Sequence, residues 1–280
     1  MFDIVSIFDR ELVRHHRDRA AEGFAAHDFL FREVSGRLVD RLQDIRRYFP
    51  LALELGCRTG GGLTEFVREG QGGVVACLVR SDLSEGMARR AGAQAIGDQP
   101  PVLTVVTDEE RLPFQTGRFD LVFSNLALHF VNDLPGTLIQ IRQVLKPDSL
   151  FLASMIGGSS LSELRAAFAE AESAEEGGWS PRVSPFADVR DVGNLLQRTG
   201  FVLPVADCDT LTISYPDPLQ LLLDLRGMGE SNAMRERRRA PLRRGTLKAA
   251  LDRYHTLHAD VAGRVPATVQ ILYLTAWTPS

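Results

Sequence analysis

The stretch Leu51-Ala52-Leu53-Glu54-Leu55-Gly56-Cys57-Arg58-Thr59-Gly60-Gly61-Gly62 decides the fold of this chain. Its first five residues form a short, mostly apolar run, which is typical of a strand buried in a parallel sheet. Glycines follow, and because glycine has no Cβ, the backbone can turn sharply and a ligand can approach it closely. A strand, a glycine-rich turn and the start of a helix together predict the ligand crevice of an open α/β sheet.

Alternating strands and helices surround this turn and predict a parallel sheet with helices on both faces. The expected strands are 51–55, 74–79, 102–106, 119–124 and 150–155, with helices over 61–69, 84–93 and 134–145. The last of these helices is expected to stop at Lys146-Pro147, because proline cannot continue a helix.

The regions on either side of this alternation are predicted to be mainly helical. Residues 1–49 are expected to form an amphipathic arm that lies over the crevice as a lid, or simply covers the sheet. Residues 50–280 are expected to form the α/β domain, with substrate-side insertions at about 157–200 and 214–262. The elements expected after residue 156 are helices 160–176, capped near Ser159 or Ser160, 188–199, 216–228 and 246–259, and strands 202–212 and 269–277.

Composition and charge exclude several classes of protein. The chain has 44% apolar residues, 24% charged residues and a net charge of −4, so nothing in its overall charge suggests a nucleic-acid partner. The three cysteines have no CxxC spacing and are expected to be reduced thiols. No apolar run reaches the roughly 18 residues of a transmembrane helix, and no secretory signal is evident. We therefore expect a cytoplasmic bacterial protein, with a mature organellar form as the alternative.

Acidic residues follow the first three predicted strands, where an open α/β sheet binds its ligand. Asp82 can accept both hydroxyls of a ribose through its two carboxylate oxygens, and Asp108 can accept an adenine amino group. The alternatives are a helix N-cap for Asp82 and a solvated loop position for Asp108. Asn125 and His129 follow the fourth strand and are candidate catalytic residues, although a buried structural histidine is the common alternative.

Several segments resemble class I S-adenosylmethionine-dependent methyltransferases. They are Leu53-Glu54-Leu55-Gly56-Cys57-Arg58-Thr59-Gly60, Ser81-Asp82-Leu83-Ser84, Leu112-Pro113-Phe114, Phe119-Asp120-Leu121-Val122 and Leu145-Lys146-Pro147-Asp148. This resemblance covers residues 50–156. It implies a Rossmann-like, seven-stranded sheet whose last strand is antiparallel, with S-adenosyl-L-methionine in the crevice.

A closer resemblance extends over nearly the whole chain. Its segments include Phe8-Asp9-Arg10, Asp108-Glu109-Glu110, Glu176-Gly177-Gly178-Trp179-Ser180-Pro181, Gly227-Met228-Gly229-Glu230-Ser231-Asn232 and Val265-Pro266-Ala267-Thr268. These are similar to the family of arginine-hydroxylating assembly factors of respiratory complex I and their bacterial relatives. The resemblance implies a complex I subunit as protein substrate, with transient association at the membrane surface through complex I. The cofactor contacts expected in the crevice are Glu54, Gly56, Cys57, Gly60, Asp82, Leu83, Asp108, Glu109 and Asn125.

Two later segments are candidates for contact with the substrate. The aromatic loop around Trp179 and the segment around Glu230 and Asn232 are hypothesised to form a lid, with ordinary loop hydrogen bonding as the alternative. Glu230 is also a catalytic candidate, because a carboxylate pairs with a guanidinium in bidentate geometry. No metal site is expected, although His255, His258 and Asp260 raise a weaker iron hypothesis. The basic run from Arg235 to Arg244 is interpreted as a solvated loop or as a docking surface for an acidic partner.

Arg58 departs from the family pattern, which has glycine at this position. A non-glycine residue in the left-handed region costs about 1–2 kcal/mol, and a cation there would repel the sulfonium of the cofactor. The leading hypothesis is an S-adenosylmethionine-binding enzyme that modifies, by hydroxylation, an arginine of a complex I subunit. The rivals are a methyltransferase of a small-molecule or acyl-carrier-bound carboxyl of the biotin-synthesis type, and a non-catalytic assembly chaperone.

Overall fold

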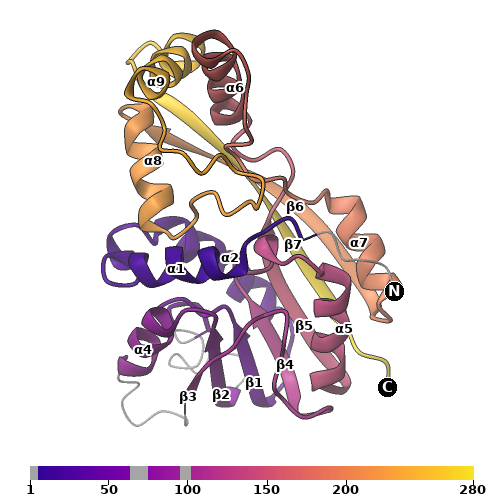
Figure 1. Cartoon of the computed structure of the whole chain (residues 1–280). Helices are drawn as coiled ribbons and strands as arrows, with labels where there is room; N and C mark the ends of the chain where they lie inside the picture. Colours follow the sequence, from indigo (N-terminus) through magenta and orange to yellow (C-terminus); the bar gives the residue numbers. More distant parts are fainter. Residues whose placement is uncertain (1–5, 64–74, 95–101) are drawn as a thin grey trace.

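Seven strands form one sheet in the order β3-β2-β1-β4-β5-β7-β6 (Figure 1). The computed structural model describes residues 6–63, 75–94 and 102–280. The strands are β1 (Phe49–Leu55), β2 (Val75–Asp82), β3 (Val102–Val106), β4 (Phe119–Ser124), β5 (Leu145–Ile156), β6 (Val202–Tyr215) and β7 (Val265–Trp277). The first five pair in parallel, whereas β7 runs antiparallel to both β5 and β6. The predicted Rossmann-like sheet with an antiparallel last strand is confirmed.

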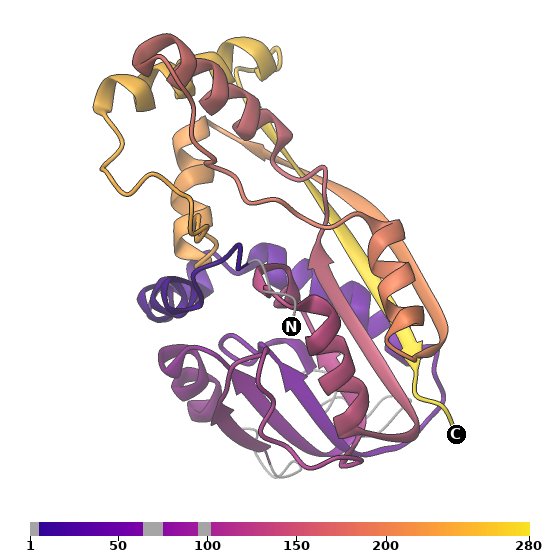
Figure 2. The ribbon, with the colours of Figure 1, turned by 45° about the vertical axis from the view of Figure 1, so that its right-hand side comes forward.

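Helices cover both faces of this sheet (Figure 2). They are α1 (Arg10–Ala20), α2 (Phe29–Gln43), α4 (Glu85–Ala93), α5 (Leu134–Val144), α6 (Ser162–Glu176), α7 (Val189–Arg198), α8 (Pro218–Gly227) and α9 (Arg244–His258), with short 3-10 turns η1 (Phe24–Ala26) and η2 (Leu128–Phe130). Side chains of successive residues in β1 point to opposite faces of the sheet. Ala52 packs in the hydrophobic cluster that contains α2, whereas Leu53 packs in the cluster that contains α5 and α7. Of the predicted helix 61–69, residues 64–69 lie outside the described residues.

Two differences between the predicted and the observed element ends have a clear physical cause. The helix over 134–145 ends at Val144 as expected to within one residue, but β5 begins at Leu145 and not at residue 150, so Lys146-Pro147 lies within the strand. Lys146 Nζ lies 2.9 Å from both carboxylate oxygens of Asp120 on the neighbouring strand, which offers it a better partner than the helix end. The N-cap of α6 is Leu161, in the left-handed region at φ 55°, and neither Ser159 nor Ser160 caps the helix. Ser160 Oγ bonds to the backbone of Gln270 instead.

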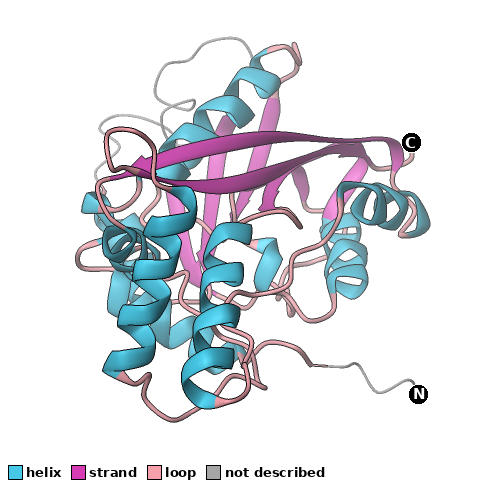
Figure 3. Ribbon diagram, turned by 90° about the horizontal axis from the view of Figure 1, so that it is seen from above, coloured by secondary structure: helices cyan, strands magenta, loops and turns pink. Residues whose placement is uncertain are grey.

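Strands β6 and β7 extend beyond the rest of the sheet as a long ribbon (Figure 3). This ribbon supports α6, α8 and α9, which stand above the sheet in Figure 1. Helix α1 of the N-terminal arm lies between these helices and the carboxyl ends of the parallel strands. It contacts both α4 and α8. Within the described part of the chain, no helix is long and apolar enough to span a membrane.

Candidate functional site

Acidic side chains at the ends of β2 and β3 are paired with arginines of the N-terminal arm. Arg17 Nη1 lies 2.5 Å from Glu109 Oε1 and 3.4 Å from Asp82 Oδ1, and all three side chains are fully buried. Arg10, two helical turns earlier in α1, contacts Asp108 at 2.5 Å and also contacts Glu109. The arm therefore closes over the predicted crevice through ion pairs as well as apolar packing.

These pairs keep the buried groups charged. Burial alone would raise the pKa of Glu109, but the charges of Arg17 and Arg10 outweigh it and lower that pKa to about 2. Burial acts against the charge of Arg17, yet Glu109 and Asp82 raise its pKa above the ordinary value. Removing one member would leave an uncompensated buried charge, so the arm and the crevice depend on each other.

The glycine turn is tightly packed against its neighbours. Gly56 has φ 72°, and a Cβ added there would lie 2.2 Å from the Ala127 Cβ, so only glycine fits. Gly60 has φ 88°, a backbone conformation that residues with a side chain rarely adopt. Glu54 is buried at the end of β1 and accepts a hydrogen bond from the Leu63 backbone N–H at 3.2 Å. Burial raises the pKa of Glu54 against the opposing charge of Arg80.

Arg58 turns into the protein, with φ 50° and 3% exposure. Its backbone N–H donates to Asp82 Oδ2 at 3.0 Å, and its Nη2 donates to Glu230 Oε1 at 2.7 Å and to the Leu126 carbonyl at 3.2 Å. Its guanidinium also lies over the ring of Phe31, 5.2 Å from the centroid. The residue that departs from the glycine pattern therefore joins Asp82 at the end of β2 to the segment after α8.

Glu230 meets His129 at the same point. His129 Nε2 lies 2.8 Å from Glu230 Oε2, and both side chains are buried. Burial opposes the charge of Glu230, but His129 and then Arg58 outweigh it and lower the pKa of the carboxyl. Burial and the nearby Arg17 lower the pKa of Arg58, which still stays protonated as arginines do in proteins. The result is an ionised carboxylate between an imidazole and a guanidinium.

The remaining predicted site residues have different surroundings. The Asn125 amide donates to the Phe31 carbonyl and accepts from Ser154 Oγ, so it ties the end of β4 to α2 and β5. Asn232 donates to the Pro181 carbonyl at 2.8 Å and thus joins the two loops predicted as a lid. Trp179, by contrast, is 70% exposed. Two others are buried beside the turn: Cys57, whose pKa is raised by burial, and Leu83, which packs with Phe8 and Val13 of the arm segment.

Sequence reasoning missed the two arginines of the arm. Arg10, Val13, Arg17 and Ala20 recur at helical spacing and share one face of α1, and this is the signal that could have found them. A buried face that carries two arginines requires acidic partners, because arginine is almost never fully buried unless it is paired.

The weaker iron hypothesis is not supported. Among the described residues, no group of three or more histidine, cysteine, aspartate or glutamate side chains is arranged to hold a metal. Asp260 instead accepts hydrogen bonds from the backbone of Ala262 and Arg264, and His255 is exposed on α9.

The chemistry of the crevice residues fits S-adenosylmethionine. Asp82 and Asp108 offer carboxylate oxygens to a ribose and an adenine amino group. Arg17 Nε and Nη2 are buried, and neither atom has a hydrogen-bond partner in the described part of the chain. Unpaired donors of this kind suit a carboxylate such as that of a methionine. In this structure Asp82 and Asp108 hold arm arginines, so a bound nucleoside would compete with Arg17 and Arg10.

Comparison with known proteins agrees with this geometry. A family model described as a methyltransferase domain matches residues 53–153. The arginine-hydroxylase NDUFAF5, mitochondrial, of Danio rerio is 41% identical over 277 residues, which cover 98% of this chain and 84% of that protein. A malonyl-[acyl-carrier protein] O-methyltransferase of Gallionella capsiferriformans is 32% identical over 279 residues, covering 98% of this chain and 92% of that protein.

A solved structure shares the fold. It is a putative methyltransferase from Bacillus halodurans, with a TM-score of 0.59 and 14% sequence identity, which covers 88% of this chain and 99% of that one. At this identity the likeness concerns the fold of the chain alone.

Proposed function

Because the chain belongs to the S-adenosylmethionine-dependent methyltransferase family and is 41% identical to a mitochondrial arginine hydroxylase, we propose that it modifies an arginine of a partner protein. We propose that the partner is a subunit of respiratory complex I and that the modification is hydroxylation during assembly. The cofactor of the proposal is S-adenosyl-L-methionine, whose sulfonium would supply an electrophilic methyl group and so serves methylation. Hydroxylation also consumes molecular oxygen and two electrons from a reductant, with one oxygen atom entering an arginine C–H bond and the other leaving as water. We place the protein in the bacterial cytoplasm, or in the matrix if it is mitochondrial.

Full-length similarity supports the arginine hydroxylase over the acyl-carrier methyltransferase. Identity to the Danio rerio protein is 41%, against 32% for the Gallionella capsiferriformans protein, over almost the same share of this chain. The aligned regions include the arm and the substrate-side insertions, where the two kinds of enzyme must differ in what they bind.

The observation that carries the proposal is the guanidinium bound to Glu230. The carboxylate is buried, kept ionised and oriented by His129, and it already holds the guanidinium of Arg58 at 2.7 Å. A carboxylate matches the planar fork of a guanidinium in bidentate geometry. We propose that the acceptor arginine meets Glu230 here, in exchange with Arg58.

In this proposal each residue has a limited role. Asp82, Asp108 and the glycine turn hold the nucleoside, and Arg17 holds the methionine carboxylate. His129 keeps Glu230 in place, and Glu230 orients the acceptor guanidinium. The arm and the loops around Trp179 and Asn232 cover the crevice and limit the access of water, as closing segments do in other enzymes.

Mass spectrometry of complex I subunits from a deletion strain tests the proposal. Loss of about 16 Da, one oxygen atom, from a single arginine supports hydroxylation, and loss of about 14 Da, one CH₂ unit, supports methylation. Complementation with the wild-type gene should restore the mass, and complementation with Glu230→Gln should not. A mass unchanged by the deletion, with complex I still failing to assemble, would favour the non-catalytic chaperone.

A further inference from the structure

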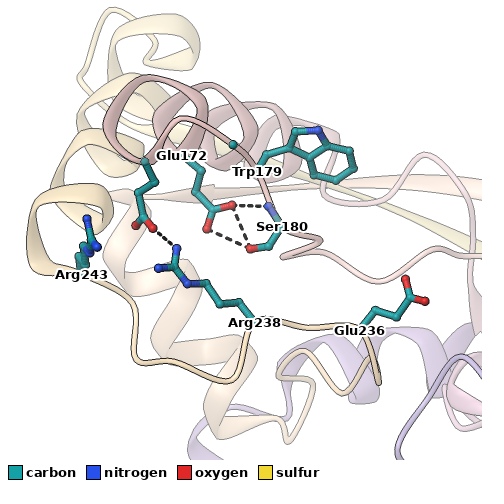
Figure 4. Close-up of a pocket in the computed structure, with 8 residues that line it drawn as sticks. Glu172, Trp179, Ser180, Glu236, Arg238 and Arg243 are labelled. Carbon is teal, nitrogen blue, oxygen red and sulfur yellow. Dashed lines mark hydrogen bonds and ion pairs between the residues drawn. The ribbon is translucent and has the colours of Figure 1, made fainter.

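An apolar groove of about 790 Å³ adjoins the site described above. One wall is α6 with Phe168, another is the loop that carries Trp179 and Phe186, and Met234 lies at its edge. A second, smaller pocket lies next to this groove and is shown in Figure 4. Trp179 and Glu236 border that pocket from different segments of the chain. The same two side chains line the groove itself.

The groove borders the Glu230 site and shares wall residues with it. The Phe186 ring, which lines the groove, packs edge-on against the His129 ring at a centroid distance of 6.0 Å. Asn232 joins the loop after Glu230 to Pro181 in the groove wall through a 2.8 Å hydrogen bond. A chain segment seated in the groove would therefore lie beside the carboxylate proposed to receive the acceptor arginine.

Three charged side chains line the groove, and among the described residues only Arg182 is paired with an opposite charge. Arg182 pairs with Glu172, and Arg165 donates to the Ser184 carbonyl. Glu236 is exposed, and its carboxylate has no hydrogen bond or ion pair with any residue that the structure describes. The groove thus combines apolar walls with one acceptor for a positive charge.

Trp179 adds a second feature that suits a cation. Its side chain is 70% exposed at the rim, although a large apolar surface normally becomes buried. An indole face attracts a guanidinium through its quadrupole, and a guanidinium that stacks on the ring can still donate from its edge to a carboxylate.

We propose that this groove binds the segment of the protein substrate next to the acceptor arginine, and that the segment is extended, apolar and carries one further basic side chain. That side chain pairs with Glu236 and stacks on Trp179. The inference rests on the proposed function, because it takes the partner to be a protein with an acceptor arginine.

Peptide binding to the full-length protein tests the proposal. The probes are synthetic peptides of alanine and leucine with one fixed acceptor arginine and a second arginine placed at successive positions on either side. Each has a matched peptide in which the second arginine is citrulline, a neutral isostere. Calorimetry should show that one spacing binds better with arginine than with citrulline, by about three- to tenfold.

Two variants and a control test whether Glu236 and Trp179 cause the preference for the arginine peptide. Glu236→Gln should abolish the arginine preference while leaving the citrulline peptide unaffected, and Trp179→Ala should weaken both peptides. Glu175→Gln, at an exposed acid of α6 that does not line the groove, should change neither. An arginine preference that survives Glu236→Gln, no preference at any spacing, or tighter binding of a malonyl thioester than of either peptide would overturn the proposal.

Failure of the groove and failure of the proposed function give different results. If the wild-type protein modifies its complex I subunit but Glu236→Gln and Trp179→Ala do so equally well, the groove is wrong and the function stands. If the peptides bind with the expected dependence on Glu236 but the subunit mass is unchanged by gene deletion, the groove stands and the function is wrong.

Discussion

At the scale of single residues, Arg58 changes the meaning of the glycine turn. The family pattern has glycine here, and this chain places a buried cation in the left-handed region at φ 50°. The side chain is held by Glu230, the Leu126 carbonyl and the Phe31 ring, which together offset the strain of about 1–2 kcal/mol. Arg58 is buried and has three partners, so we infer that it is a structural part of this site and not a neutral replacement for glycine.

Replacing Arg58 by glycine should tighten the binding of S-adenosylmethionine. The substitution removes a buried cation near the expected sulfonium and leaves space beside the turn, so we expect an increase in affinity of roughly tenfold. Calorimetry with the cofactor measures it, and Thr59→Gly controls for a more flexible turn. Weaker binding would contradict this expectation and would assign the Arg58 guanidinium to the methionine carboxylate.

Glu109 should make the stability of the protein depend on pH. Its folded pKa of about 2 lies below the ordinary value of 4.5, so its stabilising contribution is complete above about pH 5 and is lost as the pH falls toward 2. A shift of this size is worth about 3 kcal/mol. Denaturant unfolding at several pH values should show that Glu109→Gln destabilises the protein most near neutral pH, and that the difference shrinks in acid. The exposed Glu85→Gln should show a small difference throughout, and a constant deficit for Glu109→Gln would mean that its charge is unimportant.

At the scale of secondary structure, the sequence predicted the sheet better than the arm. The run from Leu51 to Leu55 and the glycines after it define a buried strand and a turn by local composition alone, and the structure places both as expected. The start of β5 at Leu145 was missed, because the proline rule applies to helices and says nothing of a strand end where Pro147 is exposed. The partners of Arg17 lie more than 60 residues away, so no local pattern could identify them.

Arg17→Met should release the arm from the crevice. It leaves Asp82 and Glu109 buried with less compensating charge, and loss of one partner of a buried pair costs about 3–5 kcal/mol. We expect lower stability in denaturant and faster proteolysis within α1. Arg14→Met, on the exposed side of the same helix, should match the wild type. If both variants are cleaved at the same rate, apolar packing alone holds the arm.

At the scale of the whole molecule, a short segment after α8 joins the helices above the sheet to the carboxyl ends of the strands. Glu230 follows α8 and binds Arg58 of the glycine turn and His129 after β4. The next residues reach the arm, because the Asp9 N–H donates to the Ala233 carbonyl at 2.8 Å and Phe8 forms a bridge with Met234. One short segment after α8 thus contacts the crevice, the arm and the groove. A conformational change in any one of these three regions should therefore alter the other two.

Glu230→Gln tests this connection across the molecule. The variant leaves Arg58 buried without its closest counter-charge, which should cost about 3–5 kcal/mol and loosen the segment after α8. Because that segment also holds the arm, hydrogen exchange should rise both in residues 228–236 and in α1, with Glu175→Gln as the unchanged control. An increase confined to residues 228–236 would show that the ion pairs of Arg10 and Arg17 hold the arm independently. Substrate-side loops and cofactor crevice would then open separately, and binding of one ligand would not prepare the site for the other.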